Sequence, residues 1–251
     1  MNLTVDLNAD LGEDAGHDAE LFGLISSASI ATGFHAGNAD TMHAAVLAAK
    51  AQNVAVGAHP SFFDRENFGR KELKVGLNEV FNGIVYQLGI FQAIATSVGI
   101  RPNHVKPHGA LYNMAVRDLK LAEAIARAIK SVDSELILFA PDNTDLARAG
   151  EAQGLQIARE VFADRNYLSD GLLVPRTRSD ALLTDPVEAA TRVLRMLREG
   201  KVRSVEDADV DVHAETICVH SDTPRAVQFA RELRSQLESQ GVRIKAPQRS
   251  L

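Results

Sequence analysis

The chain has little of what several classes of protein need. It contains one cysteine in 251 residues, Cys218, which excludes an internal disulfide framework. Its 27 basic and 33 acidic residues give a net charge of −6, without the basic excess that nucleic-acid binding requires. The N-terminal segment carries Asp6 and Asp10 instead of the basic start and apolar stretch of a signal peptide. We therefore expect a cytoplasmic protein whose partners are small molecules or other proteins.

Membrane-spanning runs and common nucleotide-binding motifs are also missing. The uncharged stretch at residues 80–100 contains polar residues and has its apolar residues at helical spacing, so it predicts a buried amphipathic helix. The sequence has no G-x-x-x-x-G-K-[ST], G-x-G-x-x-G, G-x-S-x-G, C-x-x-C or H-E-x-x-H motif. By itself it shows no recognisable ATP site, dinucleotide site, serine-hydrolase elbow or zincin helix.

What the sequence does contain is an alternation of short apolar runs and longer helical patterns. No linker, low-complexity tract or fixed-period repeat divides the chain, so we expect one domain over residues 1–251. The predicted strands are residues 3–7, 28–32, 54–57, 104–106, 136–139, 155–158 and 216–219. Repeated βα units predict parallel strands with right-handed crossovers. This α/β pattern fits a (β/α) barrel of about seven strands, with a doubly wound open sheet as the alternative.

Four histidines follow apolar runs, in the blocks ATGFHAG, VAVGAHPS, HVKPHGALYN and TICVHSD. They are His35, His59, His108 and His220. Because parallel α/β folds gather the carboxyl ends of their strands at one face, residues this far apart in sequence can meet there. Neutral imidazole acts as a base, an acid or a ligand near neutral pH, so we predict an active site at this face. The other histidines are expected to be structural or superficial: His17, His43, His104 and His213.

The opening segment VDLNADLGE contributes side chains with oxygen atoms to the predicted site. Asp6, Asn8 and Asp10 alternate, so they share one face of a strand, where they either hold a cation or water or form a polar strand end. Glu13 and Asp14 stand where helix N-caps are expected and receive less weight.

Lys106 lies two residues before His108, so in an extended segment both side chains point the same way. An unpaired buried charge is costly, so Lys106 either stabilises a developing oxyanion or neutralises a buried carboxylate such as Asp10. Cys218 is expected to be a small buried hydrophobe and not a nucleophile.

Two long connections, residues 61–75 and 160–186, are expected to cover or line the site. The second carries Asp164, Arg165 and Arg176, which either form a surface ion pair or bind an anionic substrate.

Taken in order, VDLNADLGE, FHAGNAD, GAHPSFFDRENFGR, VKPHGALYN, EVFADRNY, DGLLVPR and ICVH closely resemble the LamB/YcsF family. The similarity runs from Asp6 to about His220. It implies a single-domain (β/α)7-type barrel related to the glycoside hydrolase and polysaccharide deacetylase group. Members of the family are the A subunit of bacterial 5-oxoprolinase. The resemblance therefore also implies ATP-dependent opening of 5-oxo-L-proline to L-glutamate, in a complex with subunits B and C.

Three positions depart from the family pattern. Thr32 stands where the family has cysteine, which argues against an essential thiol. Asn38 replaces an aspartate, which removes a carboxylate role there, and Ser221 replaces a glycine beside His220.

Because the chain lacks a nucleotide loop, we expect the ATP step to depend on the partner subunits. This barrel would then host water attack on a lactam activated by phosphorylation of its oxygen. The predicted catalytic residues are Asp10, His35, His59, Lys106 and His108. The predicted substrate-binding residues are Asn8, Asp164, Arg165, Arg176 and His220. Two alternatives stay open: a stand-alone deacetylase that uses a divalent metal ion bound by Asp10 and the histidines, and a non-catalytic scaffold that binds lactams or partners.

Overall fold

The computed structural model describes residues 3–14, 16–220 and 225–249. Within these residues, seven parallel strands close into a barrel, because β9 pairs with both β6 and β1. The barrel strands are, in spatial order, β1 (Thr4–Leu11), β2 (Ser27–Ala31), β3 (Ala55–His59), β4 (His104–Val105), β5 (Ile137–Ala140), β6 (Ile157–Phe162) and β9 (Thr216–Val219). The predicted barrel is confirmed, and its closure rules out the open doubly wound sheet.

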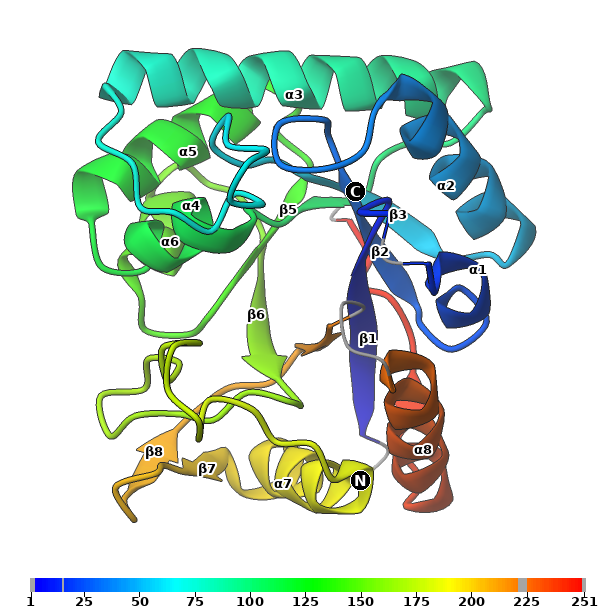
Figure 1. The fold of residues 1–251 in the computed structure, drawn as a ribbon, viewed down its shortest axis with the longest axis vertical. Helices are drawn as coiled ribbons and strands as arrows, with labels where there is room; N and C mark the ends of the chain where they lie inside the picture. Colours follow the sequence, from blue (N-terminus) through cyan, green and yellow to red (C-terminus); the bar gives the residue numbers. More distant parts are fainter. Residues whose placement is uncertain (1–2, 15, 221–224, 250–251) are drawn as a thin grey trace.

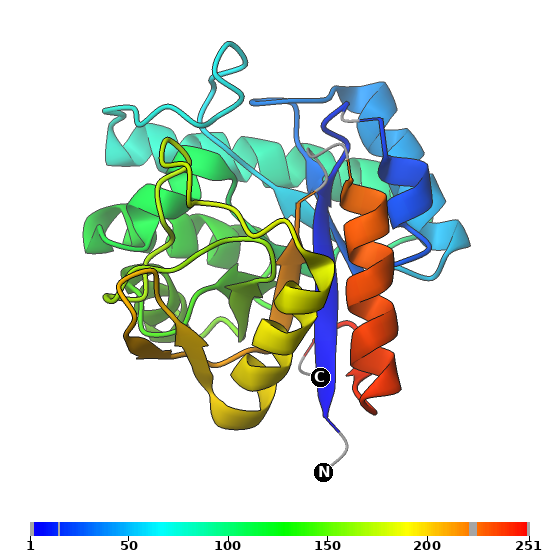
Figure 2. The ribbon, with the colours of Figure 1, turned by 60° about the horizontal axis from the view of Figure 1, so that its bottom comes forward.

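Helices surround this barrel (Figures 1 and 2). They are α1 (Asp18–Leu21), α2 (Ala39–Ala51), α3 (Leu77–Ser97), α4 (Gly109–Ala115), α5 (Leu119–Val132), α6 (Asp145–Ala152), α7 (Pro186–Glu199) and α8 (Ala226–Ser239). The uncharged stretch forms most of α3, which packs against α2 and α5. Among the helices of the described residues, none combines the length and apolarity that crossing a lipid bilayer requires.

Local sequence signals account for the helix ends. The side chain of Asp185 caps α7 by accepting hydrogen bonds from two backbone N–H groups of the first turn, and Pro186 occupies the first helical position. Gly200 ends α7 in the left-handed conformation, with φ 67°. In α5, Leu121, Ile125 and Ile129 are buried at the helical spacing expected for one apolar face.

The first strand separates two environments. Every residue of β1 after Thr4 is buried. Asn8, on the inward face, bonds to Glu160 of β6 and accepts a hydrogen bond from Lys106 across the barrel. The inward face of this strand is therefore polar, while the intervening apolar residues belong to the hydrophobic core.

Short elements that the sequence did not predict complete the fold. β10 (Arg243–Ile244) pairs with the start of β1, and β7 (Lys201–Arg203) pairs with β8 (Asp209–Asp211) in an antiparallel hairpin. This hairpin and α7 belong to the long connection between β6 and β9, at the bottom of Figure 1.

Candidate active site

A cavity of about 510 Å³ lies at the carboxyl ends of the barrel strands. Seven of the ten predicted site residues line it: Asp10, His59, Lys106, His108, Arg165, Arg176 and His220. The other three lie behind its wall, where Asn8 contacts Lys106, His35 stacks on His108 and Asp164 pairs with His220. The structure thus brings all ten residues together, while their catalytic and binding roles stay predictions.

Lys106 lies at the centre of a buried charged network. Its Nζ is 3.0 Å from Asp10 Oδ1 and 2.9 Å from Glu160 Oε1. It also donates hydrogen bonds to Asn8 Oδ1 at 3.2 Å and to Cys218 Sγ at 3.0 Å. Burial opposes the charge of Lys106, but Asp10, Cys218 and Glu160 outweigh it and raise the lysine pKa well above its ordinary value. The ammonium group both neutralises buried carboxylates and faces the cavity.

Glu160 was not among the predicted site residues. Its Oε2 accepts a 2.7 Å hydrogen bond from the hydroxyl of Tyr112, and its Oε1 accepts one from Asn8 Nδ2 at 3.1 Å. Burial, reinforced by Glu160, raises the pKa of Tyr112 well above its ordinary value. The available signal was the position of Glu160, two residues after the predicted strand 155–158.

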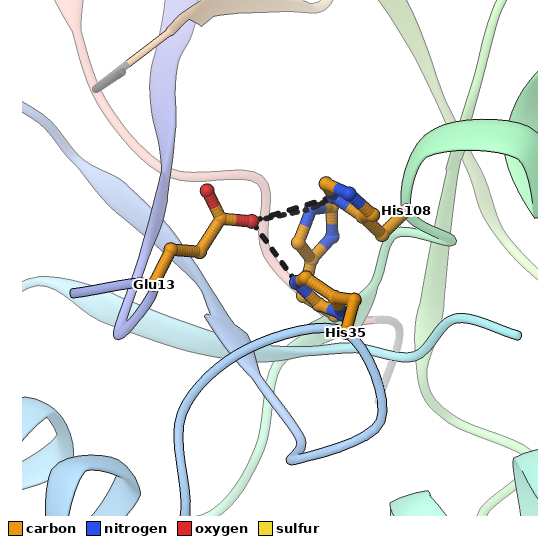
Figure 3. A group of neighbouring side chains, drawn as sticks. Glu13, His35 and His108 are labelled. Carbon is orange, nitrogen blue, oxygen red and sulfur yellow. Dashed lines mark hydrogen bonds and ion pairs between the residues drawn. The ribbon is translucent and has the colours of Figure 1, made fainter. Parts of the chain in front are cut away.

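A second cluster joins three histidines to Glu13 (Figure 3). Glu13 Oε1 lies 3.0 Å from His35 Nε2, 3.3 Å from His108 Nδ1 and 3.7 Å from His59 Nε2. His59 Nε2 and His108 Nδ1 are 2.9 Å apart, and the rings of His35 and His108 stack at 3.8 Å. Gly69, at φ 65°, lets the backbone approach closely, because a Cβ there would lie 2.9 Å from both His35 and His108.

The expectation that Glu13 caps a helix is wrong. The nearest helix, α1, begins only at Asp18, and the side chain of Glu13 is buried against the histidines. Strand alternation ends at Leu11, and Gly12 takes a left-handed conformation with φ 72°. This turn redirects the chain, so a periodic pattern could not show where the Glu13 carboxylate points. By contrast, Asn38 is an N-cap: its side chain accepts hydrogen bonds from the first turn of α2.

The pKa values of Asp10 and the three histidines are shifted in different directions. Burial favours a neutral Asp10, but His59 and Lys106 outweigh it and keep the pKa of Asp10 well below its ordinary value. Burial also disfavours protonation of His59, yet Asp10 and Glu13 raise the pKa of this histidine above its ordinary value. Burial, together with the charge of neighbouring histidines, keeps the pKa of His35 and His108 well below that value.

Two arginines, Arg165 and Arg176, also line the cavity. Arg165 is 5% exposed and donates to the backbone carbonyls of Val174 and Ala181. Burial and the charge of nearby Arg176 lower the pKa of Arg165 to about 10. Arg176 is exposed at the cavity rim. Two guanidinium groups thus face one cavity, an arrangement suited to an anionic ligand.

Asp164 does not form the surface ion pair that the sequence left open. It is buried, and its Oδ1 lies 2.8 Å from His220 Nδ1. Burial favours its neutral form, but His220 outweighs this and lowers the pKa of Asp164. Asp164 therefore orients His220, which lines the cavity. Ser221, one of the three departures from the family pattern, lies outside the described residues.

His104 behaves as the structural residue that we expected. It is fully buried, its Nε2 is 3.2 Å from the hydroxyl of Ser29, and its ring stacks on Phe139 at 4.1 Å. Burial lowers the pKa of His104 to about 3.

Comparisons with known proteins bear on this site. Residues 5–251 match the model of the LamB/YcsF family. The 5-oxoprolinase A subunit of Oceanobacillus iheyensis is 45% identical over 249 residues, covering 97% of each chain. The protein of the same name from Geobacillus kaustophilus is 46% identical over 250 residues, covering 98% of each chain.

Solved structures give a concordant result. The lactam utilization protein from Thermus thermophilus superimposes with a TM-score of 0.92, at 44% identity, over 98% of this chain and 100% of that chain. The T48 deacetylase has a TM-score of 0.50 at 13% identity, over 97% of this chain and 87% of that chain. The latter likeness concerns the fold alone.

Proposed function

This chain belongs to the LamB/YcsF family, and we propose from this membership that it is the A subunit of an ATP-dependent 5-oxoprolinase. With subunits B and C, it would hydrolyse the lactam of 5-oxo-L-proline to L-glutamate. The proposal rests on one observation: the chain is 45% and 46% identical, over nearly its whole length, to two proteins that are named as 5-oxoprolinase A subunits.

The charged residues that line the cavity support this substrate. 5-Oxoproline carries a carboxylate at one end and a lactam carbonyl at the other. Arg165 and Arg176 offer charge-assisted hydrogen bonds to the carboxylate, whereas Lys106 lies on the side of Asp10 and the histidines. One molecule spanning the cavity would therefore place its lactam oxygen toward the ammonium group of Lys106.

The chemistry of lactam opening assigns roles to these groups. A lactam is a resonance-stabilised amide, and phosphorylation of its oxygen by ATP would give an imidate phosphate whose ring carbon water can attack. The ring nitrogen would then leave as an amine to give an acyl phosphate, and a second water would release phosphate and L-glutamate. Lys106 would stabilise the negative charge on the lactam oxygen and its phosphoryl group. Asp10 contacts both Lys106 and His59, so it links this charge to the histidines that would orient the water and supply a proton to the departing nitrogen.

The partner subunits are proposed because the reaction uses ATP. Because the sequence lacks the phosphate-binding loops named above, we assign the use of ATP to the complex that this chain forms with subunits B and C. A cytoplasmic location stays a prediction from the sequence.

The test measures glutamate released from 5-oxoproline by this chain alone, by subunits B and C alone, and by all three, each with and without ATP. We expect turnover only with all three subunits and ATP. Absence of glutamate from the complete, folded mixture would refute the function, whereas robust ATP-dependent turnover by the single chain would refute the dependence on partners.

A matched pair of variants tests substrate binding in the same assay. Arg176→Met should lower kcat/KM for 5-oxoproline by about 10–100-fold, the effect of losing one charge-assisted hydrogen bond. Arg178→Met is the control, because Arg178 is also exposed but pairs with Asp180 outside the cavity lining. Equal kcat/KM values of the two variants would show that Arg176 does not bind the substrate.

A further inference from the structure

The histidine cluster contains hydrogen-bond acceptors that face one another. Each of the three rings has one nitrogen turned outward to a fixed partner and one turned inward to Glu13 Oε1. The proton carried by each outward nitrogen decides what the inward nitrogen can do, since a neutral imidazole has one N–H and one lone pair.

The outward partner of His35 is a hydroxyl group whose proton is already used. The hydroxyl of Ser61 donates to the carbonyl of Phe62 at 2.7 Å. Its oxygen therefore accepts from His35 Nδ1, 3.0 Å away, and the proton of the neutral ring lies on Nδ1. This leaves a lone pair on His35 Nε2, which points to Glu13.

The outward partners of the other two rings are backbone carbonyls, which only accept hydrogen bonds. His59 Nδ1 donates to Lys106 O at 2.7 Å, and His108 Nε2 donates to Phe68 O at 2.8 Å. In the neutral rings the lone pairs are therefore on His59 Nε2 and His108 Nδ1, only 2.9 Å apart. Outer partners of this kind fix the orientation of histidines that ligate metals.

The spacing of the inward atoms fits one small cation. Around a tetrahedral Zn²⁺ ion with bonds of about 2.0–2.1 Å, neighbouring donor atoms lie roughly 3.3–3.4 Å apart. Four of the six distances between inward atoms are 2.9, 3.0, 3.3 and 3.7 Å, and all four atoms lie within 4.8 Å of one another. Three imidazole nitrogens and one carboxylate oxygen form a donor set suited to Zn²⁺ and its neighbours in the first transition row.

We propose that Glu13, His35, His59 and His108 together bind one divalent transition-metal ion of the Zn²⁺ or Co²⁺ type. The cavity gives such an ion access, because Glu13, His59 and His108 also line it. A bound ion would supply Lewis-acid chemistry next to Lys106. The proposal stands on the geometry of the four side chains and does not require the lactam reaction.

The first experiment measures metal content and affinity in the full chain, without substrate, ATP or partner subunits. Protein purified without chelator is analysed by mass spectrometry for metals, then stripped and titrated with Zn²⁺ and with Co²⁺. We expect about one ion per chain, a higher Tm with metal and the visible absorption of four-coordinate Co²⁺. If the stripped protein takes up neither ion, the proposal is wrong. A proton on one of the inward nitrogens would then hold the cluster together by a hydrogen bond.

Variants identify the ligands. Glu13→Gln keeps the shape of the side chain and should weaken Co²⁺ binding by on the order of 100-fold, with an altered absorption spectrum. Glu20→Gln is the control, because Glu20 is exposed on the nearby α1. His35→Ala provides a second ligand variant, and circular dichroism verifies that each variant is folded. Wild-type affinity in folded Glu13→Gln would refute this site even if the chain binds metal elsewhere.

Discussion

Replacing Lys106 by methionine would remove the only ammonium group that contacts both Asp10 and Glu160 among the described residues. Lys106 is 3% exposed, and the two carboxylates are also buried. Methionine has a similar length and can fill the space, but it leaves both carboxylates without this countercharge. The variant therefore tests how far the barrel interior depends on one charge.

The expected loss of stability is large. Breaking a buried ion pair by removing one partner costs about 3–5 kcal/mol, because the remaining charge is left uncompensated. In a chain of this size each kcal/mol lowers Tm by about 2–4 °C, so Lys106→Met should melt roughly 6–20 °C below the wild-type chain. Lys106→Met/Glu160→Gln has one buried carboxylate fewer, so it should recover part of the loss, on the order of 1–3 kcal/mol.

Thermal and urea unfolding at neutral pH measure these differences, with Lys120→Met as the control for an exposed lysine. In the proposed complex with subunits B and C, the folded fraction of Lys106→Met should also lose about 100-fold or more in kcat, because the proposed oxyanion donor is missing. A Tm within about 2 °C of wild type, the shift of an ordinary surface substitution, would refute the structural part of this reasoning. Near-normal turnover of the surviving folded protein would instead show that Lys106 is structural only.

Two further substitutions probe the barrel interior, and a third, at an exposed helical position, is a control. Burial raises the pKa of Asp6 from 3.8 to about 6 in the folded chain, so its contribution to stability is full below about pH 4 and is lost as pH rises through 6. The stability of Asp6→Asn relative to wild type should therefore increase by about 2–3 kcal/mol between pH 4 and pH 7 in urea unfolding, and a constant difference would contradict the shift. Gly57→Ala should destabilise the chain by about 1–3 kcal/mol, because its Cβ would lie 2.2 Å from the ring of His104. Gly89→Ala, on an exposed helical position with open space, should stabilise it by about 0.5–1 kcal/mol, and equal melting of the two variants would count against the packing argument.

The sequence was informative where periodicity and strand polarity act together. The runs that predicted strands all overlap the barrel strands. His35 and His108 follow β2 and β4, and His59 is the last residue of β3. Parallel strands must present their carboxyl ends on one face, so meeting there follows from topology and needs no knowledge of side-chain contacts. The hairpin of β7 and β8 and the pairing of β10 were missed because such short segments carry little periodic signal.

Glu13 and Glu160 show where such reasoning stops. Both are buried carboxylates, although glutamate is rarely buried unless it is paired. Each is balanced by residues far away in sequence. Which glutamate meets Lys106 and which meets the histidines depends on strand register and on the turn at Gly12. These are three-dimensional facts that one sequence without its structure does not encode visibly.

The closure of the barrel by β9 has a consequence for how the chain is made. Thr216 of β9 bonds to Asp6 across 210 residues, so the contact that seals the barrel forms between the beginning of the chain and a segment synthesised late. Until then, β1 and β6 are exposed edges that can pair with other chains. Such distant pairing also makes folding slow. The protein is therefore most prone to aggregate during synthesis and folding, before β9 closes the barrel.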